Sequence, residues 1–185
     1  IIAFVGTHST GKTTLLNNFK DKYPNYHYIT EVARGCPYQL NEKTDFISQD
    51  WILRHQISKE LSAPSHEISI SDRSTYDQLA YVQYSYEHGN MTQDEYEYLK
   101  RKLIHWGICQ YDFLFYLPIE FPLSSDGVRS DDEKYREEID HLIRDILEYY
   151  VSENRWMEVR GSVEERMKII NDKLIELAQD NKILR

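Results

Sequence analysis

The residues with the clearest chemistry stand at positions 6–13 of this 185-residue chain and read Gly-Thr-His-Ser-Thr-Gly-Lys-Thr. They satisfy the phosphate-binding pattern G-x-x-x-x-G-K-[S/T] at every fixed position. The glycines let backbone N–H groups curl around phosphate oxygens, the lysine reaches the β- and γ-phosphates, and the last threonine hydroxyl ligates Mg²⁺. The segment therefore predicts a site for a nucleoside triphosphate with Mg²⁺. The residues expected to contact the nucleotide are Gly6, His8, Ser9, Thr10, Gly11, Lys12, Thr13 and Thr14, with Thr13 also on the metal.

The sequence on either side of this segment predicts the local structure that the pattern requires. Residues 1–5 are an apolar run suited to a buried parallel strand, and residues 13–22 place Leu15, Leu16 and Phe19 on one helical face. Strand, glycine-containing loop and helix N-terminus therefore follow in the necessary order. The alternative is a chance match in a turn before an ordinary helix.

Predicted strands and helices alternate along the rest of the chain. Further strands are expected near 27–30, 67–71, 111–117 and 156–159, and further helices near 44–61, 76–88, 92–110, 139–150 and 163–179. This alternation predicts an α/β fold of the three-layer P-loop NTPase type. Its five-stranded parallel sheet would carry helices on both faces and bind ligands at the C-terminal ends of the strands. Residues 1–185 are expected to form a single domain, because no linker or change of composition divides them.

A long polar connection, residues 118–131, precedes the helix expected near 139–150. Connections of this length are often functional lids, and the lid is expected to span about residues 118–132. It contains Asp126-Gly127-Val128-Arg129. Arg129 is a candidate to neutralise the charge on the γ-phosphoryl oxygens during transfer, and a solvated surface arginine is the alternative.

Charged residues follow the predicted strands at the edge where a ligand is expected. The third strand leads into Asp72-Arg73-Ser74 and the fifth into Arg160-Gly161-Ser162, whose three residues are further candidate nucleotide contacts. Asp72 is expected to hold Mg²⁺ directly or through water, with a helix N-cap as the alternative. Arg73 is expected to contact the transferred or acceptor phosphate, because a guanidinium fork matches phosphate geometry.

The acceptor half of the site is predicted from Glu31, which follows the second strand. A carboxylate near the γ-phosphate repels an acceptor phosphate, whereas it can orient a hydroxyl and accept its proton. A hydroxyl acceptor is therefore favoured, and a structural ion pair between Glu31 and Arg34 is the alternative. The candidate acceptor-binding residues are Glu31, Arg34, Gln49, Gln56, Arg73 and Tyr76, and Phe46, Trp51 and Gln83 are further residues that could line a ring pocket.

Composition narrows the class of partner. The chain carries 31 acidic and 22 basic side chains, for a net charge of −9, which disfavours general affinity for nucleic-acid backbones while leaving a local basic groove open. No segment is long and apolar enough to suggest a membrane span. Cys36 and Cys109 lie far apart without metal-ligand spacing, so we expect reduced thiols and a cytoplasmic protein.

These residues together resemble two related groups of P-loop kinases. In deoxyribonucleoside kinases the second strand ends in a glutamate that acts as catalytic base and the third in Glu-Arg-Ser, to which Glu31 and Asp72-Arg73-Ser74 are similar. The nicotinamide riboside kinase domain of the bifunctional NAD-biosynthesis regulator, with its ATPase-like relatives, looks closer. That group is matched by Glu31-Val32-Ala33-Arg34 and Asp126-Gly127-Val128-Arg129. The resemblance spans nearly the whole chain. The chain departs from some nicotinamide riboside kinases in lacking their Asp-x-Asp pair, since Asp72 stands alone before an arginine.

The first hypothesis is an ATP-dependent kinase that phosphorylates a hydroxyl of a small nucleoside-like molecule. Lys12 would hold ATP, Thr13 and Asp72 would organise Mg²⁺, and Glu31 would orient the hydroxyl. Arg73 and Arg129 would stabilise the transferring phosphoryl group. Three alternatives remain: a nucleoside monophosphate kinase, a kinase of a hydroxymethylated base in DNA, and a regulatory P-loop ATPase.

Overall fold

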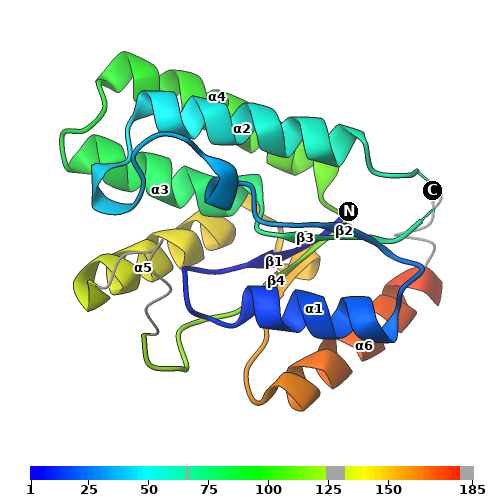
Figure 1. The fold of residues 1–185 in the computed structure, drawn as a ribbon. Helices are drawn as coiled ribbons and strands as arrows, with labels where there is room; N and C mark the ends of the chain where they lie inside the picture. The colour runs from blue at the N-terminus through cyan, green and yellow to red at the C-terminus, as the bar shows by residue number, and fades with distance from the viewer. Residues whose placement is uncertain (66, 124–131, 180–185) are drawn as a thin grey trace.

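The computed structural model describes residues 1–65, 67–123 and 132–179. Within them lie five strands and six α-helices (Figure 1). The strands are β1 (Ile2–Val5), β2 (His27–Ile29), β3 (Ser69–Asp72), β4 (Phe113–Tyr116) and β5 (Trp156–Glu158). The α-helices are α1 (Lys12–Lys22), α2 (Phe46–Leu61), α3 (Thr75–Glu87), α4 (Gln93–Gln110), α5 (Glu133–Tyr150) and α6 (Val163–Gln179).

The five strands form one parallel sheet in the order β2-β3-β1-β4-β5. The register aligns Ile2 of β1 with Ile70 of β3 and with Phe113 of β4. Because the strands are parallel and in register, their C-terminal ends meet at one edge, where ligands of such sheets bind. The loops after β1, β2 and β3 therefore lie next to one another.

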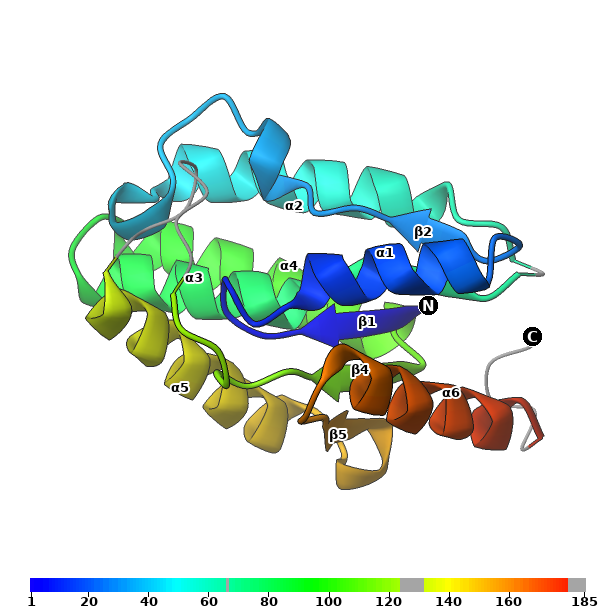
Figure 2. The ribbon, with the colours of Figure 1, turned by 60° about the horizontal axis from the view of Figure 1, so that its bottom comes forward.

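Helices cover both faces of the sheet, which makes three layers (Figures 1 and 2). Along β1, Ile2 and Phe4 point to one face and pack with the apolar sides of α1 and α6. Ala3 and Val5 point to the other face and pack in a core built from α2, α3, α4 and α5. The predicted α/β fold with a five-stranded parallel sheet is confirmed.

Helix-capping side chains fix where the helices begin. Asp45 caps α2 through a reciprocal pair of hydrogen bonds with Ser48, and Thr92 caps α4 in the same way with Glu95. Asp132 accepts hydrogen bonds from the backbone N–H groups of Lys134 and Tyr135, which starts α5 at Glu133. The periodicity that begins at Ile139 therefore predicts the start of α5 too late.

Three short 3₁₀ turns were not predicted: Ala33–Gly35, Asn41–Lys43 and Glu153–Arg155. The first two lie between β2 and α2, on the side of the sheet edge where Glu31 stands. Within the described part of the chain, no helix is long and apolar enough to cross a membrane. The expected Asp126 and Arg129 of the lid lie at 124–131, outside the described residues.

Candidate functional site

The phosphate-binding loop joins β1 to α1, as the motif predicts. Gly6 and Gly11 have φ angles of 152° and 88°. Glycine adopts these values without steric cost, and a side chain at Gly6 would collide with the carbonyl oxygen of Leu117. Ser9 also takes a left-handed conformation, with φ at 55°. The loop is thus held in a curled backbone conformation of the kind that presents N–H groups to an anion.

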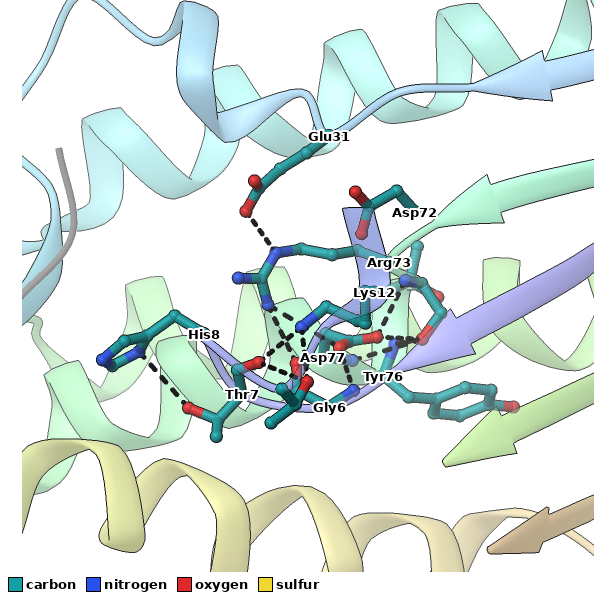
Figure 3. A network of polar contacts seen from close by, with 12 residues as sticks. Gly6, Thr7, His8, Lys12, Glu31, Asp72, Arg73, Tyr76 and Asp77 are labelled. Atoms are coloured by element: carbon teal, nitrogen blue, oxygen red, sulfur yellow. Dashed lines mark hydrogen bonds and ion pairs between the residues drawn. The ribbon is translucent and has the colours of Figure 1, made fainter. Parts of the chain in front are cut away.

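Lys12 begins α1 and is folded over this loop. Its side chain is 2% exposed, and its ammonium group donates hydrogen bonds to the carbonyl oxygen of Thr7 and, over 3.2 Å, to Oγ1 of Thr10. Figure 3 shows the lysine reaching back across the loop toward Thr7. The charge is therefore aimed at the space that the loop encloses, which suits a β- or γ-phosphate.

Thr13 and Asp72 come together beside the loop, which fits the predicted Mg²⁺ site. Oγ1 of Thr13 donates to Oδ2 of Asp72 over 2.6 Å, and Asp72 is 1% exposed. Oδ1 of Asp72 is buried and has no hydrogen-bond partner among the described residues. A buried oxygen of this kind is a natural ligand for Mg²⁺, which takes one or two protein oxygens together with phosphate oxygens and waters.

The helix-capping alternative for Asp72 is wrong. Ser74 caps α3, because its hydroxyl accepts from the N–H groups of Tyr76 and Asp77. Asp72 is instead the last residue of β3, and its side chain faces Thr13. The carboxylate is therefore available to a ligand at the sheet edge.

Glu31 lies where the loops after β2 and β3 approach each other. Its Oε1 accepts from Nε of Arg73 over 2.6 Å and its Oε2 from Nε of Arg34 over 3.0 Å (Figure 3 shows the first contact). Nη1 of Arg73 also donates to the carbonyl oxygen of Gly6 over 3.2 Å. The ion pair between Glu31 and Arg34 is thus present, and a second ion pair joins Glu31 to Arg73, which contacts the phosphate-binding loop.

Arg73 is held in an unusual backbone conformation. Its φ is 90°, in the left-handed region that costs a non-glycine residue about 1–2 kcal/mol. Such strain persists only where the surroundings over-determine it, and it concentrates at functional sites. Here the contacts to Glu31 and Gly6 supply that constraint.

Asp77 is a site residue that the sequence reasoning missed. It is fully buried in α3, and its Oδ1 accepts from the N–H of Gly6 over 2.8 Å while Oδ2 accepts from the N–H and hydroxyl of Ser74. Burial raises the pKa of Asp77 more than the nearby Arg73 and Lys12 lower it. The Ser-x-x-Asp spacing of a capping box was the available signal.

A pocket opens between the loop and the layer of α2 and α3. It contains the predicted acceptor residues Glu31, Arg34, Gln49, Gln56 and Arg73. The remaining lining residues are His8, Val32, Ala33, Leu40, Asn41, Thr44, Ile52, Ser74, Gln78 and Tyr81. The two 3₁₀ turns after β2 supply one wall, and of their residues in the lining only Arg34 was predicted.

The orientation of the amide groups in this pocket is set by their neighbours. Nε2 of Gln78 donates to both the backbone oxygen and Oε1 of Gln49, over 2.6 and 3.0 Å. Nε2 of Gln49 donates to Oγ1 of Thr44 over 2.7 Å. Nε2 of Gln56 donates to Glu60 and Ser71. The wall is therefore polar and ordered before any ligand arrives.

Tyr76 was expected in this pocket and lies elsewhere. It is 3% exposed, its ring lies 6.2 Å from that of Tyr111, and a Cβ on Gly107 would come within 2.7 Å of it. Figure 3 shows the ring pointing away from Glu31 and Lys12. The side chain packs against α4 in the core because α3 turns that face away from the sheet edge. His8, Gln78 and Tyr81 line the pocket in its place.

The three further pocket suggestions also lie outside the lining. Phe46 packs on Tyr98 and Trp51 stacks on His55. Gln83 forms an exposed hydrogen bond with Glu87.

Arg160, Gly161 and Ser162 follow β5, which lies across β1 from β2 and β3 in the sheet. Gly161 donates its N–H to the carboxylate of Glu120, with a closest distance of 3.1 Å. The same carboxylate binds Arg166, which reaches the carbonyl oxygen of Thr10. Gly161 is thereby joined to the phosphate-binding loop, whereas Arg160 pairs with Glu158.

A family model described as an AAA domain matches residues 1–166. The chain belongs to this AAA-domain family. A search of curated proteins gave no match.

Solved structures share the fold. Deoxyadenosine kinase from M. mycoides with products dCMP and a flexible dCDP bound has a TM-score of 0.74 and 22% identity, over 95% of this chain and 98% of that one. NadR in complex with NR has a TM-score of 0.74 and 18% identity, over 95% of this chain and 50% of that one. This AAA-domain chain thus spans about half the length of NadR. The predicted resemblance to P-loop kinases is confirmed at the level of the fold.

Proposed function

We propose that this AAA-domain protein is an ATP-dependent kinase that transfers the γ-phosphoryl group to a hydroxyl of a small nucleoside-like molecule, of the nucleoside or nicotinamide riboside class. The position of Glu31 carries the proposal. Its side chain is 5% exposed, lines the pocket, and is bound by Arg73, which also contacts Gly6. One ion-paired network therefore joins this pocket to the phosphate-binding loop.

The donor half uses the loop and its flanking charges. Lys12 and the curled backbone bind the phosphates, and Arg73 is close enough to Gly6 to approach the transferred group. Thr13 and Asp72 are the residues that would hold Mg²⁺. When bound, this ion neutralises charge on the phosphate oxygens.

The acceptor half uses Glu31 as general base. The hydroxyl oxygen of the acceptor attacks the γ-phosphorus, the bond from that phosphorus to the bridging oxygen of ADP breaks, and the hydroxyl proton passes to Glu31. Arg34 is 41% exposed and Arg73 is 13% exposed. The acceptor hydroxyl therefore replaces Arg34 more cheaply than Arg73, since the exposed partner exchanges its contact for water.

The pocket wall supports a planar, polar acceptor. Gln49, Gln56 and Gln78 present amide groups, and Tyr81 presents an aromatic ring beside the guanidinium group of Arg73, 5.3 Å from the ring centre. Amides read donor and acceptor atoms on a heterocyclic base, and an aromatic face stacks on it. The names of the structural neighbours, deoxyadenosine kinase and NadR with NR, agree with this acceptor class.

A nucleoside monophosphate kinase is the second candidate. Two guanidinium groups, from Arg34 and Arg73, face the pocket, and arginine forks bind phosphate well. Glu31 between them counts against it, because its carboxylate would repel an acceptor phosphate.

We also propose that residues 1–185 form a single domain and that the protein is cytoplasmic. The free thiols of Cys36 and Cys109 support the location.

The test is a screen of nucleosides, nucleoside monophosphates and nicotinamide riboside with ATP and Mg²⁺, following ADP release and product mass. We expect phosphorylated nucleosides or nicotinamide riboside. Product from monophosphates alone would favour the second candidate. ADP release that no acceptor stimulates would instead identify a regulatory ATPase and overturn the proposal.

A further inference from the structure

Two arginines outside the pocket are buried beside the phosphate-binding loop. Arg136 belongs to the first turn of α5 and is 0% exposed, and Arg166 belongs to the first turn of α6 and is 2% exposed. Arginine is almost never fully buried unless it is paired, since a desolvated charge is costly. The partners of these two guanidinium groups therefore indicate why the arginines are buried.

Arg136 binds the loop from one side. Its Nε donates to the carbonyl oxygen of His8 over 3.3 Å, and its Nη2 donates to that of Ser9 over 3.1 Å. Nη2 also donates to the carbonyl oxygen of Phe121 over 2.8 Å, and Nη1 pairs with Glu133 over 3.1 Å. Most of its hydrogen bonds thus go to neutral backbone oxygens.

Arg166 binds the next peptide unit of the same loop. Its Nη1 donates to the carbonyl oxygen of Thr10 over 2.7 Å. Its Nη2 pairs with Glu120 over 2.5 Å, and the guanidinium group lies 4.9 Å from the ring centre of Phe121. The carbonyl oxygens of three consecutive residues, His8, Ser9 and Thr10, are therefore held by two arginines.

Because peptide units are planar, these contacts to carbonyl oxygens also orient the N–H groups of the loop. A peptide unit is planar and trans, so its N–H points opposite to its carbonyl oxygen. Fixing the carbonyl oxygens of residues 8–10 against α5 and α6 turns the N–H groups of residues 9–11 to the other side. That side is the interior of the loop, where Lys12 also lies. Ser9 has a left-handed backbone conformation, with φ at 55°. The contacts from the two arginines must stabilise this strained conformation.

We infer that Arg136 and Arg166 are positioning residues for the triphosphate: they clamp the outer carbonyl oxygens of the loop so that its N–H groups are aimed at the phosphates before ATP arrives. This inference rests on the proposed ATP binding and deepens it. Through the same two arginines, the loop is also joined to Phe121 and Glu120, which follow β4.

The experiment is a calorimetric titration without acceptor, using Mg²⁺-ATP and, separately, inorganic tripolyphosphate. The variants are Arg136→Ala, Arg136→Lys and Arg166→Lys. Arg144→Ala is the matched control, because Arg144 is also in α5 and ion-paired, to Glu158, but does not touch the loop. Amide hydrogen exchange of residues 9–11 and the melting temperature are measured on each variant.

Arg136→Ala should weaken binding of both ligands by about 10- to 100-fold, the effect of losing hydrogen bonds from a charged donor. The lysine variants keep the positive charge but lose the planar guanidinium group, so they should weaken binding by a smaller factor. They also serve as folded variants for the measurement if Arg136→Ala does not fold. Exchange at residues 9–11 should speed up, and the control should bind as the wild type does.

Wild-type affinity for tripolyphosphate in the folded lysine variants, with unchanged exchange at residues 9–11, would overturn the clamp. A lower melting temperature accompanied by unchanged affinity would do the same. Because the titration contains no acceptor, a failed substrate screen would overturn the proposed kinase activity and leave this result standing.

Discussion

The donor and acceptor halves of the proposed site are built in different ways. The donor half is one short loop whose backbone does the binding, supported by Lys12 and held from outside by two buried arginines. The acceptor half is a pocket of side chains from two 3₁₀ turns, α2 and α3. A backbone site accepts any triphosphate, whereas a side-chain site selects its ligand. From this difference we expect the donor half to bind the nucleotide and the acceptor half to select the substrate.

The largest effect is expected from Lys12→Ala, which removes the buried ammonium group from the donor half. Transfer should fall by at least about 10³-fold, since a preorganised charge at the transferring group is lost. Lys20→Ala, an exposed change in the same helix, is the control. Single-turnover kinetics with saturating acceptor measure the transfer rate. A Lys12→Ala variant that keeps more than a tenth of the wild-type rate would contradict the proposed role of Lys12 in the donor half.

Gln49→Leu should break the acceptor half alone. It removes the amide that orders Thr44 and Gln78 while keeping the side-chain volume, so KM for the acceptor should rise about 10-fold, the cost of one lost hydrogen bond and an unsatisfied partner. KM for ATP should stay within about 2-fold of wild type. The matched control is Gln83→Leu, because Gln83 lies outside the pocket lining. Equal changes in KM for the acceptor and KM for ATP would contradict the proposal that the two halves bind different ligands.

Glu60 provides a test by pH beneath the acceptor half. Burial raises the pKa of Glu60, although hydrogen bonds from Trp106, Gln56 and Tyr111 lower it. A carboxyl group whose pKa is higher in the folded protein than in the unfolded chain binds its proton more tightly in the folded protein. The free energy of unfolding should therefore fall as pH rises from the unfolded-chain pKa to the folded-state pKa. The fall is about 1.4 kcal/mol for each pH unit between those two pKa values.

Chemical denaturation of wild type and Glu60→Gln across pH 4 to 8 measures this effect. The stability of the wild type relative to the variant should decline with rising pH. A constant difference would show that Glu60 ionises as it does in the unfolded chain.

The smallest effect is expected from Tyr76→Phe, which tests the corrected placement of that residue. Its ring packs against Gly107 in the core, away from the pocket. KM for the acceptor should stay within about 2-fold. Tyr81→Phe and Tyr81→Ala are the comparison, since Tyr81 lines the pocket. A larger rise in KM for the acceptor in Tyr76→Phe than in Tyr81→Ala would contradict the placement of Tyr76 outside the pocket.

The fold could be predicted, and the donor half proposed, because their signals are local in the sequence. Apolar runs and helical periodicity mark the strands and helices, and the phosphate-binding motif is contiguous. Asp72 followed from its place after a strand. The acceptor wall was harder, because the rotation of α3 decides whether Tyr76 or Gln78 faces the pocket. The hydrogen bond from the N–H of Gly6 to Asp77 in α3 is a long-range contact that no periodicity reveals.

The buried arginines have a signal in the sequence. Arg136 precedes Ile139 and Ile143 on the buried side of α5, and Arg166 precedes Ile170 and Leu174 on that of α6. A charged residue at the end of an apolar stripe breaks the pattern of an amphipathic helix. Such a residue must find a partner inside, and here the partner is the loop.

The central claim, that Glu31 takes the proton of the acceptor hydroxyl, is tested most directly by Glu31→Gln in single-turnover kinetics. Glu148→Gln, an exposed change in α5, is the control. We predict ATP affinity within about 2-fold of wild type and transfer slowed by about 10²- to 10⁴-fold, the usual contribution of a general base. Transfer at the wild-type rate in Glu31→Gln would contradict it.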